Sequence, residues 1–349
     1  MDKVVGKVLL LRADASTRIG TGHVMRCLAL AQAWQDSGGR AVFAMAMETP
    51  ALVDRLISEG MEVFHLSTEP GSLDDAEQTA DRAQSMGSDW VVMDGYHFGS
   101  EYQRAIKEFG LRLLFIDDYG HADHYRADII LNQNLHAHED LYIKKEPYTQ
   151  LLLGLSYTLM RREFLKLRKI KRCVPEIARN VLITTGGSDP DNMTLKLIQA
   201  FKYVNLDGLK FIVVVGGSNP YYNELKFAAQ DLNFPIYLKN DVRNMATLMA
   251  RAEVAISSGG SSIWELALMG VPVLGLARAK QEYQLLKEAS QYGIAISLGY
   301  FNNVDIFTIG EAFICLAKDR ELRSNMIRLG QSNIDGLGAS RVLNSMKYG

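Results

Sequence analysis

The sequence has few cysteines, no long hydrophobic run and almost no net charge. Its three cysteines, Cys27, Cys173 and Cys315, lie far apart, and none belongs to a CxxC motif. Such spacing argues against a disulfide framework and against a structural zinc site. No stretch reaches the roughly 20 apolar residues of a membrane-spanning helix, and the apolar run near the N-terminus is too short for a signal peptide. We therefore expect a cytoplasmic protein in a reducing compartment.

Positive and negative side chains nearly cancel, with 38 Lys and Arg against 40 Asp and Glu. This balance lacks the basic footprint of a protein that binds nucleic acid or an anionic membrane. Residues 157–172 are rich in Lys and Arg, and we interpret them as a solvated linker because charge runs usually face water. The expected partner is a small molecule, with neither nucleic acid nor membrane, and we expect a monomer.

The chain is longer than the roughly 250–300 residues at which one hydrophobic core usually stops growing. Short apolar runs alternate with amphipathic segments, which is typical of βαβ units and parallel sheets. We predict an N-terminal Rossmann-like domain over residues 1–175 and a C-terminal one over 176–349, with the last helices as candidates to pack back on the first domain. The expected strands are 8–12, 41–46, 63–66, 90–93, 113–116, 129–131, 181–184, 211–215, 236–238, 254–257 and 273–276.

The segment after the first expected strand carries the strongest candidate for chemistry. Arg12 and Asp14 end the strand, and Gly20, Gly22 and His23 precede a helical pattern. Ligands of open α/β sheets bind beyond the carboxyl ends of strands, and glycines let a ligand approach the backbone. A helix N-terminus opposes protonation of His23 and favours a neutral ring that can act as a general base. The alternative is a tight loop in which His23 only caps the helix.

Two loops of the second half could hold phosphate groups. Gly186 and Gly187 follow its first expected strand, and a Gly/Ser turn followed by a helix comes after the strand 254–257. Unpaired N–H groups at a helix start bind phosphate without lysines, and a carboxylate one turn later could bond ribose hydroxyls. The alternative is a capping turn with a surface glutamate. The candidate residues of this second loop are Ser258, Gly259, Gly260, Ser261, Ser262 and Glu265.

Other polar clusters are weaker candidates. Residues 117–124 and 136–140 contain Asp and His side chains, but they lack a usual metal-ligand signature and are more typical of polar loops. Asp94 and Tyr96 follow the strand 90–93 on the same expected sheet edge as His23, so they either line the site or form a strand-end turn. No Gly-x-Ser-x-Gly motif is present, which argues against a serine hydrolase.

Short motifs in a single order, spread over roughly residues 8–285, resemble those of a known family. They are 12–14 with 19–28, 94–96, 116–118, 131–135, 153–164, 185–190 and 258–265. This set is similar to that of the UDP-2,4-diacetamido-2,4,6-trideoxy-β-L-altropyranose hydrolases of pseudaminic acid biosynthesis, the PseG family. The resemblance implies a GT-B fold like that of the MurG-type glycosyltransferases, in which two Rossmann-like domains face across a cleft, and a role in flagellin glycosylation.

The resemblance also implies roles for single residues. His23 would activate water for attack at the anomeric carbon, with C–O cleavage, inversion and no metal or cofactor, releasing UDP and the free sugar. Tyr96 would lie in the cleft, and Glu265 would bind the ribose. Family members carry Asn-Gln after the strand 273–276, where this chain has Lys280 and Gln281. The contact of that asparagine would therefore pass to Lys280 or be lost.

The chemistry is consistent with one base and a set of helix N-termini. Glycosidases commonly need a carboxylic acid to protonate a poor leaving group, whereas UDP is already a stable anion. Three hypotheses remain open at this point: a UDP-sugar hydrolase, a GT-B glycosyltransferase that uses a sugar or lipid acceptor, and a nucleotide-sugar binding module without turnover.

Overall fold

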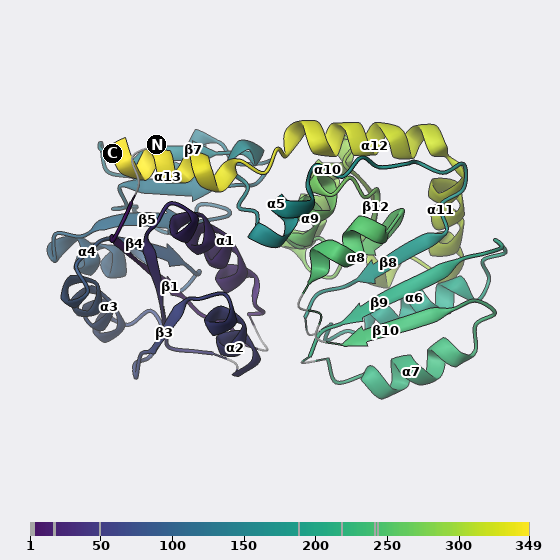
Figure 1. The fold of residues 1–349 in the computed structure, drawn as a ribbon, viewed down its shortest axis with the longest axis horizontal. Coiled ribbons are helices and arrows are strands. Elements are labelled where there is room, and N and C mark those ends of the chain that lie inside the picture. The colour runs from purple at the N-terminus through teal and green to yellow at the C-terminus, as the bar shows by residue number, and fades with distance from the viewer. Residues whose placement is uncertain are drawn as a thin grey trace. The chain divides into compact units, whose positions relative to one another are not determined.

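The computed structural model describes residues 4–348 with the exception of 17, 18, 49, 188, 218, 241 and 243. The chain divides into two compact units (Figure 1). The first unit is Met1–Arg162 with Gly336–Gly349, and the second is Glu163–Asp335. Each unit is a parallel sheet flanked by helices, so the expected α/β class with two doubly wound domains is confirmed.

The first unit contains a seven-stranded sheet in the order β3-β2-β1-β4-β5-β6-β7, in which every pair is parallel. Its strands are β1 (Val8–Ala13), β2 (Arg40–Met45), β3 (Glu62–His65), β4 (Ser88–Asp94), β5 (Arg112–Ile116), β6 (Ile129–Asn132) and β7 (Gln150–Leu153). Its helices are α1 (Gly22–Asp36), α2 (Pro50–Ser58), α3 (Leu73–Ser85), α4 (Ser100–Glu108) and α13 (Gly338–Tyr348), with short 3-10 turns at Glu139–Tyr142 and Leu155–Tyr157.

Strand β1 is buried along its whole length because helices cover both faces of the sheet. Successive side chains of a strand point to opposite faces. Leu9 and Leu11 accordingly pack in the core formed with α1, α2 and α13, whereas Val8 and Leu10 pack in the core formed with α3 and α4. Covering both faces requires a nearly continuous apolar run, which explains why this strand was recognisable in the sequence.

The second unit contains a six-stranded parallel sheet in the order β10-β9-β8-β11-β12-β13. Its strands are β8 (Asn180–Thr184), β9 (Lys210–Val215), β10 (Ile236–Asn240), β11 (Val254–Ser257), β12 (Val273–Ala277) and β13 (Ala295–Tyr300), and a 3-10 turn follows at Phe301–Asn303. Helices α6, α7 and α11 share one core with β8, β9 and β11. The helices after the first unit's last strand are α5 (Arg162–Leu167), α6 (Met193–Phe201), α7 (Tyr222–Gln230), α8 (Met245–Arg251), α9 (Ser262–Leu268), α10 (Lys280–Gln291), α11 (Ile306–Lys318) and α12 (Arg320–Asn333).

The division between the units differs from the expected boundary near residue 175, and two arginines show why. Arg162 donates to the Gln32 carbonyl and to Asp36 of α1, at 3.1 and 2.8 Å. Arg172, within the same basic segment, donates to backbone carbonyls of the second unit, and burial lowers its pKa to about 10. The segment is therefore not a wholly solvated linker. Helix α13 packs against α1, whereas α11 and α12 stay in the second unit.

Two strands, β7 and β13, were not expected from the sequence. Strand β7 has only four residues. Strand β13 contains Gly299, together with Ser297 and Tyr300, whose side chains are only partly buried. Both lie at an end of their sheet, where one neighbouring strand suffices. Among the described residues, no helix combines the length and the apolar character needed to cross a bilayer.

Candidate active site

The strand order places a topological switch point in each sheet. In the first sheet the chain runs outward in one direction from β1 and in the other from β4, and these two strands are neighbours. In the second sheet β8 and β11 have the same relation. Ligands of doubly wound sheets bind in the crevice beyond the carboxyl ends of such strands. The sequence candidates lie at or after the ends of β1 and β4 in the first unit, and after β8, β11 and β12 in the second.

His23 is the second residue of α1, and its ring is held by Asp94, the last residue of β4. The Nδ1 atom lies 2.6 Å from Oδ1 of Asp94, which is fully buried. An ionised carboxylate can only accept a hydrogen bond, so Nδ1 carries a proton, and in a neutral ring the lone pair would be on Nε2. The His23 side chain is 12% exposed. The pair therefore orients an imidazole ring that is partly accessible to solvent.

Arg26 lies one helical turn after His23 and joins two carboxylates. Its guanidinium donates to Asp94, with Nη2 at 2.7 Å from Oδ1, and to Asp118, with Nη1 at 2.7 Å from Oδ1. Residues three apart on a helix share a face, so α1 presents the base and the cation together. Burial opposes ionisation of Asp94, but the charge of Arg26 and the hydrogen bond with His23 lower its pKa. Asp94 therefore stays an anion.

Asp118 continues the network toward two further strand ends. It follows β5, and it accepts the Tyr96 hydroxyl at 2.6 Å and the Asn134 side-chain amide at 2.7 Å. The Tyr96 ring stands nearly perpendicular to that of His23, with centroids 4.9 Å apart. Burial and the Asp118 carboxylate raise the pKa of Tyr96, so its hydroxyl remains a donor. Segments after β1, β4, β5 and β6 thus meet around His23.

We expect Asp118→Asn to destabilise the protein at neutral pH and to matter less in acid. Burial opposes ionisation of Asp118, but Arg26, Tyr96 and Asn134 together hold its pKa below the usual range. A carboxyl with a lowered folded pKa contributes stability that is present above the unfolded pKa, about 3.9, and is lost as pH falls toward the folded value. The variant should lose ~1.5–3 kcal/mol at pH 7, the worth of hydrogen bonds to a charged group.

Urea unfolding of the wild type and the Asp118→Asn variant at pH 7 and at pH 3 measures this effect. The difference between the two proteins should narrow at pH 3, because the unfolded Asp118 then binds a proton while the native Asp118, whose pKa is lowered, stays ionised. An equal difference at both pH values would contradict the assignment of a charged Asp118.

Arg12 and Asp14, expected to bind substrate, are fully enclosed. Arg12 donates to both oxygens of Asp75, at 2.8 and 2.7 Å, and pairs with Asp14 at 2.8 Å. Asp14 also accepts the backbone N–H groups of Ala46 and Met47, which follow β2. Since neither side chain reaches solvent, a substrate contact does not fit these positions. Their interactions instead tie together the segments that follow β1 and β2.

The two glycines before His23 stand at the start of α1, Gly20 in the preceding loop and Gly22 as the first residue of the helix. Gly20 has a φ of +76°, a left-handed conformation that favours glycine, and its N–H donates to the Ser16 carbonyl at 2.8 Å. A β carbon added at Gly20 or Gly22 would meet no atom of the described residues within 4 Å. Among these residues, none crowds the backbone of the two glycines. Thr17 and Arg18 of this loop, like Ser188 of the loop after β8, lie outside the described residues.

The carboxylate at Asp117 has a structural role. It accepts hydrogen bonds from His121 at 2.7 Å and from the hydroxyls of Tyr125 and Tyr142, both at 3.0 Å. Burial opposes its ionisation, but these donors and the His121 charge lower its pKa. Within the described part of the chain, no three His, Cys, Asp or Glu side chains are grouped so that they could hold a metal ion.

In the second unit, the loops after β8 and β9 pack on each other. Gly186 and Gly187 are exposed, and Gly186 has a φ of +97°. A β carbon at Gly216 would lie 1.8 Å from the Gly187 carbonyl oxygen, so the close approach requires glycine there. Asp189 then accepts the N–H groups of Met193 and Thr194 at the start of α6. These contacts position the two exposed glycines at the switch point.

The loop after β11 packs on the first turn of α10. Ser258 and Gly259 are buried, Gly260 and Ser262 are partly buried, and Ser261 is exposed. Glu265 lies in the first turn of α9 and is partly buried, whereas Lys280 and Gln281 are exposed at the start of α10. Because β8, β11 and β12 are adjacent and parallel, all these expected residues share one edge of the second sheet.

Substituting Gly259 tests how closely this loop must approach α10. A β carbon at Gly259 would lie 2.3 Å from the Glu282 carbonyl oxygen, whereas one at Gly260 would meet no described atom within 4 Å. We expect Gly259→Ala to destabilise the protein by ~1–3 kcal/mol, the usual cost of overpacking, while Gly260→Ala changes stability much less. Chemical denaturation of both variants measures the difference. Equal stability of the two would show that the loop can move away from α10.

Three side chains in these sites were not singled out from the sequence as functional. The sequence analysis included Arg26 and Asn134 only as members of longer motifs. It did not include Arg278, which follows β12. The spacing of Arg26 from His23, one helical turn, was a usable signal. No sequence signal indicated that Asn134 contacts Asp118. The two residues follow neighbouring strands, and the number of residues between such strands is not fixed.

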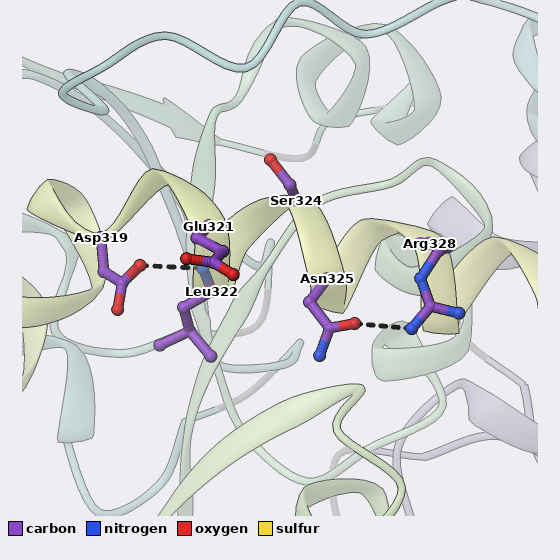
Figure 2. Close-up of a pocket in the computed structure, with 6 residues that line it drawn as sticks. All are labelled: Asp319, Glu321, Leu322, Ser324, Asn325 and Arg328. Carbon is purple, nitrogen blue, oxygen red and sulfur yellow. Dashed lines mark hydrogen bonds between the residues drawn. The ribbon is translucent and has the colours of Figure 1, made fainter.

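A separate pocket lies on α12 and is formed by one helix. In it, Asp319 accepts the Leu322 N–H at 2.8 Å, and Asn325 accepts from Arg328 at 2.7 Å (Figure 2). None of its lining residues follows a strand of either sheet, so it is not part of the candidate site. The lining residues are Asp319, Glu321, Leu322, Ser324, Asn325 and Arg328.

No model of a known protein family matches the sequence, but curated relatives do. The chain is 27% identical over 296 residues to the UDP-2,4-diacetamido-2,4,6-trideoxy-β-L-altropyranose hydrolase of Campylobacter jejuni, a match that covers 84% of this chain and 99% of that protein. It is 26% identical over 272 residues to an uncharacterised protein of Methanocaldococcus jannaschii, covering 75% of this chain and 54% of that protein. The similarity expected from the short motifs is therefore confirmed.

A third relative combines two named activities. The chain is 27% identical over 246 residues to the pseudaminic acid cytidylyltransferase and UDP-2,4-diacetamido-2,4,6-trideoxy-β-L-altropyranose hydrolase of Helicobacter pylori, covering 69% of this chain and 43% of that protein. The chain thus spans only about half the length of two of these relatives.

Solved structures support the fold. MurG of Acinetobacter baumannii superposes with a TM-score of 0.69 at 15% identity, covering 98% of this chain and all of that one. UDP-GlcNAc 2-epimerase of Neisseria meningitidis superposes with a TM-score of 0.66 at 14% identity, again covering 98% of this chain. At such identities the similarity shows the fold alone, and it confirms the GT-B-like class.

Proposed function

We propose that this protein hydrolyses a UDP-sugar to UDP and the free sugar in sugar biosynthesis. The observation that carries the proposal is the His23–Asp94 pair, 2.6 Å apart, at the switch point of the first sheet. The substrate we propose is UDP-2,4-diacetamido-2,4,6-trideoxy-β-L-altropyranose, in pseudaminic acid biosynthesis. The similarity to the Campylobacter jejuni hydrolase, over nearly the whole of that protein, supports this choice.

His23 acts in the proposed reaction as the general base. Its Nε2 takes a proton from water while the water oxygen attacks the anomeric carbon, and the bond from that carbon to the β-phosphate oxygen breaks. UDP leaves as an anion, so no acid needs to protonate it, and the configuration at the anomeric carbon inverts. Asp94 accepts the Nδ1 proton and stabilises the imidazolium that forms. Arg26 keeps Asp94 ionised and thereby in that role.

Tyr96 has a position that suits substrate binding. It is 45% exposed, and its ring stands beside His23 while its hydroxyl is fixed by Asp118. We propose that the exposed part of this ring contacts the sugar. The hydroxyl, whose pKa is raised, acts as a hydrogen-bond donor rather than as a base.

The second unit supplies the nucleotide-binding groups in this proposal. Backbone N–H groups at Gly186 and Gly187 and along residues 258–262 bind the diphosphate, and Glu265 binds the ribose hydroxyls. Lys280 and Gln281 lie exposed at the same sheet edge and are proposed as further contacts. Donors of this kind bind phosphate without a cluster of basic side chains, which agrees with the formal net charge of −2.

The experiment is hydrolysis of the proposed UDP-sugar in water enriched in ¹⁸O, without any acceptor. We expect UDP release, with the label entering the free sugar and none entering UDP, because attack is at carbon. Label in UDP would contradict C–O cleavage. Release that requires an added sugar or lipid would favour glycosyl transfer, and UDP binding without any release would favour a binding module.

A further inference from the structure

Arg278 occupies the switch point of the second sheet. It follows β12 directly, and its Nη2 lies 3.9 Å from where a β carbon of Gly186 would be. Gly186 follows β8, and β11 is the strand between β8 and β12. The Arg278 side chain therefore spans the carboxyl end of β11, among the loops that we propose bind the diphosphate.

The guanidinium of Arg278 has donors that the protein leaves unused. Its Nη2 donates to Oε1 of Glu282 at 2.8 Å, while its Nε is buried and has no hydrogen-bond partner among the described residues. A buried donor without a partner is unfavourable, so an acceptor that reaches it is bound more tightly. A phosphate offers several acceptor oxygens and matches the planar fork of a guanidinium.

Glu282 holds this arginine in place before a ligand arrives. Its Oε2 accepts the Arg278 backbone N–H at 2.7 Å while Oε1 accepts the side chain. The Arg278 and Glu282 side chains are 20% and 15% exposed, so the pair is accessible at one edge. The carboxylate neutralises Arg278 and would repel an incoming phosphate. An anionic ligand at Arg278 must therefore compete with Glu282.

We infer that Arg278 binds the diphosphate of the nucleotide and that Glu282 weakens this binding. The inference rests on the proposed function, since it places a nucleoside diphosphate at the second sheet. Arg278 would add a charged side chain to a phosphate site that otherwise consists of backbone N–H groups. The affinity for a nucleoside without phosphate should not depend on Arg278.

The test is calorimetric titration of UDP and of uridine into the full-length protein. We expect Arg278→Ala to weaken UDP binding by about tenfold or more, the worth of a charge-assisted hydrogen bond, and to leave uridine binding unchanged. Arg278→Lys should fall between, because an ammonium keeps the charge but not the fork. Glu282→Gln should tighten UDP binding, since glutamine can still accept the backbone N–H but does not neutralise Arg278.

Arg55→Ala is the matched control. Arg55 and Glu59 form an ion pair with the same spacing of four residues and the same Nη2–Oε1 distance of 2.8 Å, but in α2 of the first unit. This variant should bind UDP as the wild type does. Thermal unfolding of each variant identifies any that fails to fold. If Arg278→Ala fails to fold, the UDP affinity of Glu282→Gln tests the inference instead.

The outcomes separate this inference from the proposed function. If the wild type binds no UDP, the proposed function fails and the inference fails with it. If the wild type binds UDP and Arg278→Ala binds it equally well, only the inference is overturned and the Arg278–Glu282 pair is structural. Unchanged UDP affinity in Glu282→Gln would likewise overturn the competition between Glu282 and phosphate.

Discussion

Replacing His23 with alanine should lower the rate of UDP release by about 10²–10⁴-fold, the usual contribution of a positioned general base. Nε2 of His23 is the base in our proposal, and alanine leaves no group at this position that can take a proton from water. UDP affinity should not change, because the proposed nucleotide ligands belong to the second unit. Initial rates of UDP release, with UDP affinity measured on the same samples, give both quantities.

The control for this variant is His65→Ala. His65 is the last residue of β3, so it also ends a strand of the first sheet, but its side chain is 56% exposed and its Nδ1 lies 3.8 Å from the Glu48 carboxylate. We expect its removal to leave the rate unchanged. Full activity in His23→Ala would remove the base from the mechanism, and a loss of UDP affinity in that variant would mean that His23 acts in binding.

Replacing Asp94 with asparagine should lower the rate of UDP release nearly as much as His23→Ala does. The reason is that the proton of the His23 ring moves from one nitrogen to the other. In the wild type, Asp94 accepts from Arg26 through both oxygens and from His23 through Oδ1. An asparagine has one oxygen and one amino group. Its oxygen is expected to face Arg26, because a guanidinium can only donate, and its amino group then donates to Nδ1 of His23.

The consequence of Asp94→Asn is that the proton of the neutral imidazole moves to Nε2. That nitrogen can no longer accept a proton from water, and we expect a decrease of about 10²–10⁴-fold in the rate of UDP release. The ¹⁵N chemical shifts of the His23 ring report which nitrogen carries the proton. A merely structural role for Asp94 would lower stability without moving the proton, so an unchanged tautomer would contradict our assignment.

Asp140→Asn serves as the control for the Asp94 variant. Asp140 pairs with His138 at 3.6 Å, and both side chains are largely exposed. The replacement should therefore change neither the His23 tautomer nor the rate. A change in the rate would indicate that the assay responds to any loss of a carboxylate in the first unit.

Sequence patterns recovered most strands and the loops that follow them, but not the partners of the loop residues. Strands covered on both faces are continuous apolar runs, so they can be recognised without a structure. His23 was identified because a glycine-rich segment separates it from such a strand. Asp94 was predicted either to line the site or to form a strand-end turn, and its hydrogen bond with His23 depends on β1 and β4 being neighbours.

Arg12 shows how a local pattern can mislead. Its position at the end of β1 suggested a ligand contact, since strand ends line binding sites. Asp75, in α3, turns it inward with two hydrogen bonds, and nothing near Arg12 in the sequence indicates that contact. A charged side chain at a strand end is available to a ligand only if no buried partner competes for it.

The amino-acid sequence by itself determined the α/β class, the duplication of the doubly wound pattern and the chain segments that carry chemistry. These properties depend on the period of apolar residues and on glycine, serine and histidine at short spacing, which are local. Only the tertiary structure decided that Asp94, Arg26 and Asp118 form one network around His23, that Arg12 is buried, and that Arg278 reaches the loop after β8. Those contacts join residues far apart in the chain, and the order of strands in the sheet, rather than the spacing along the sequence, sets which of them meet.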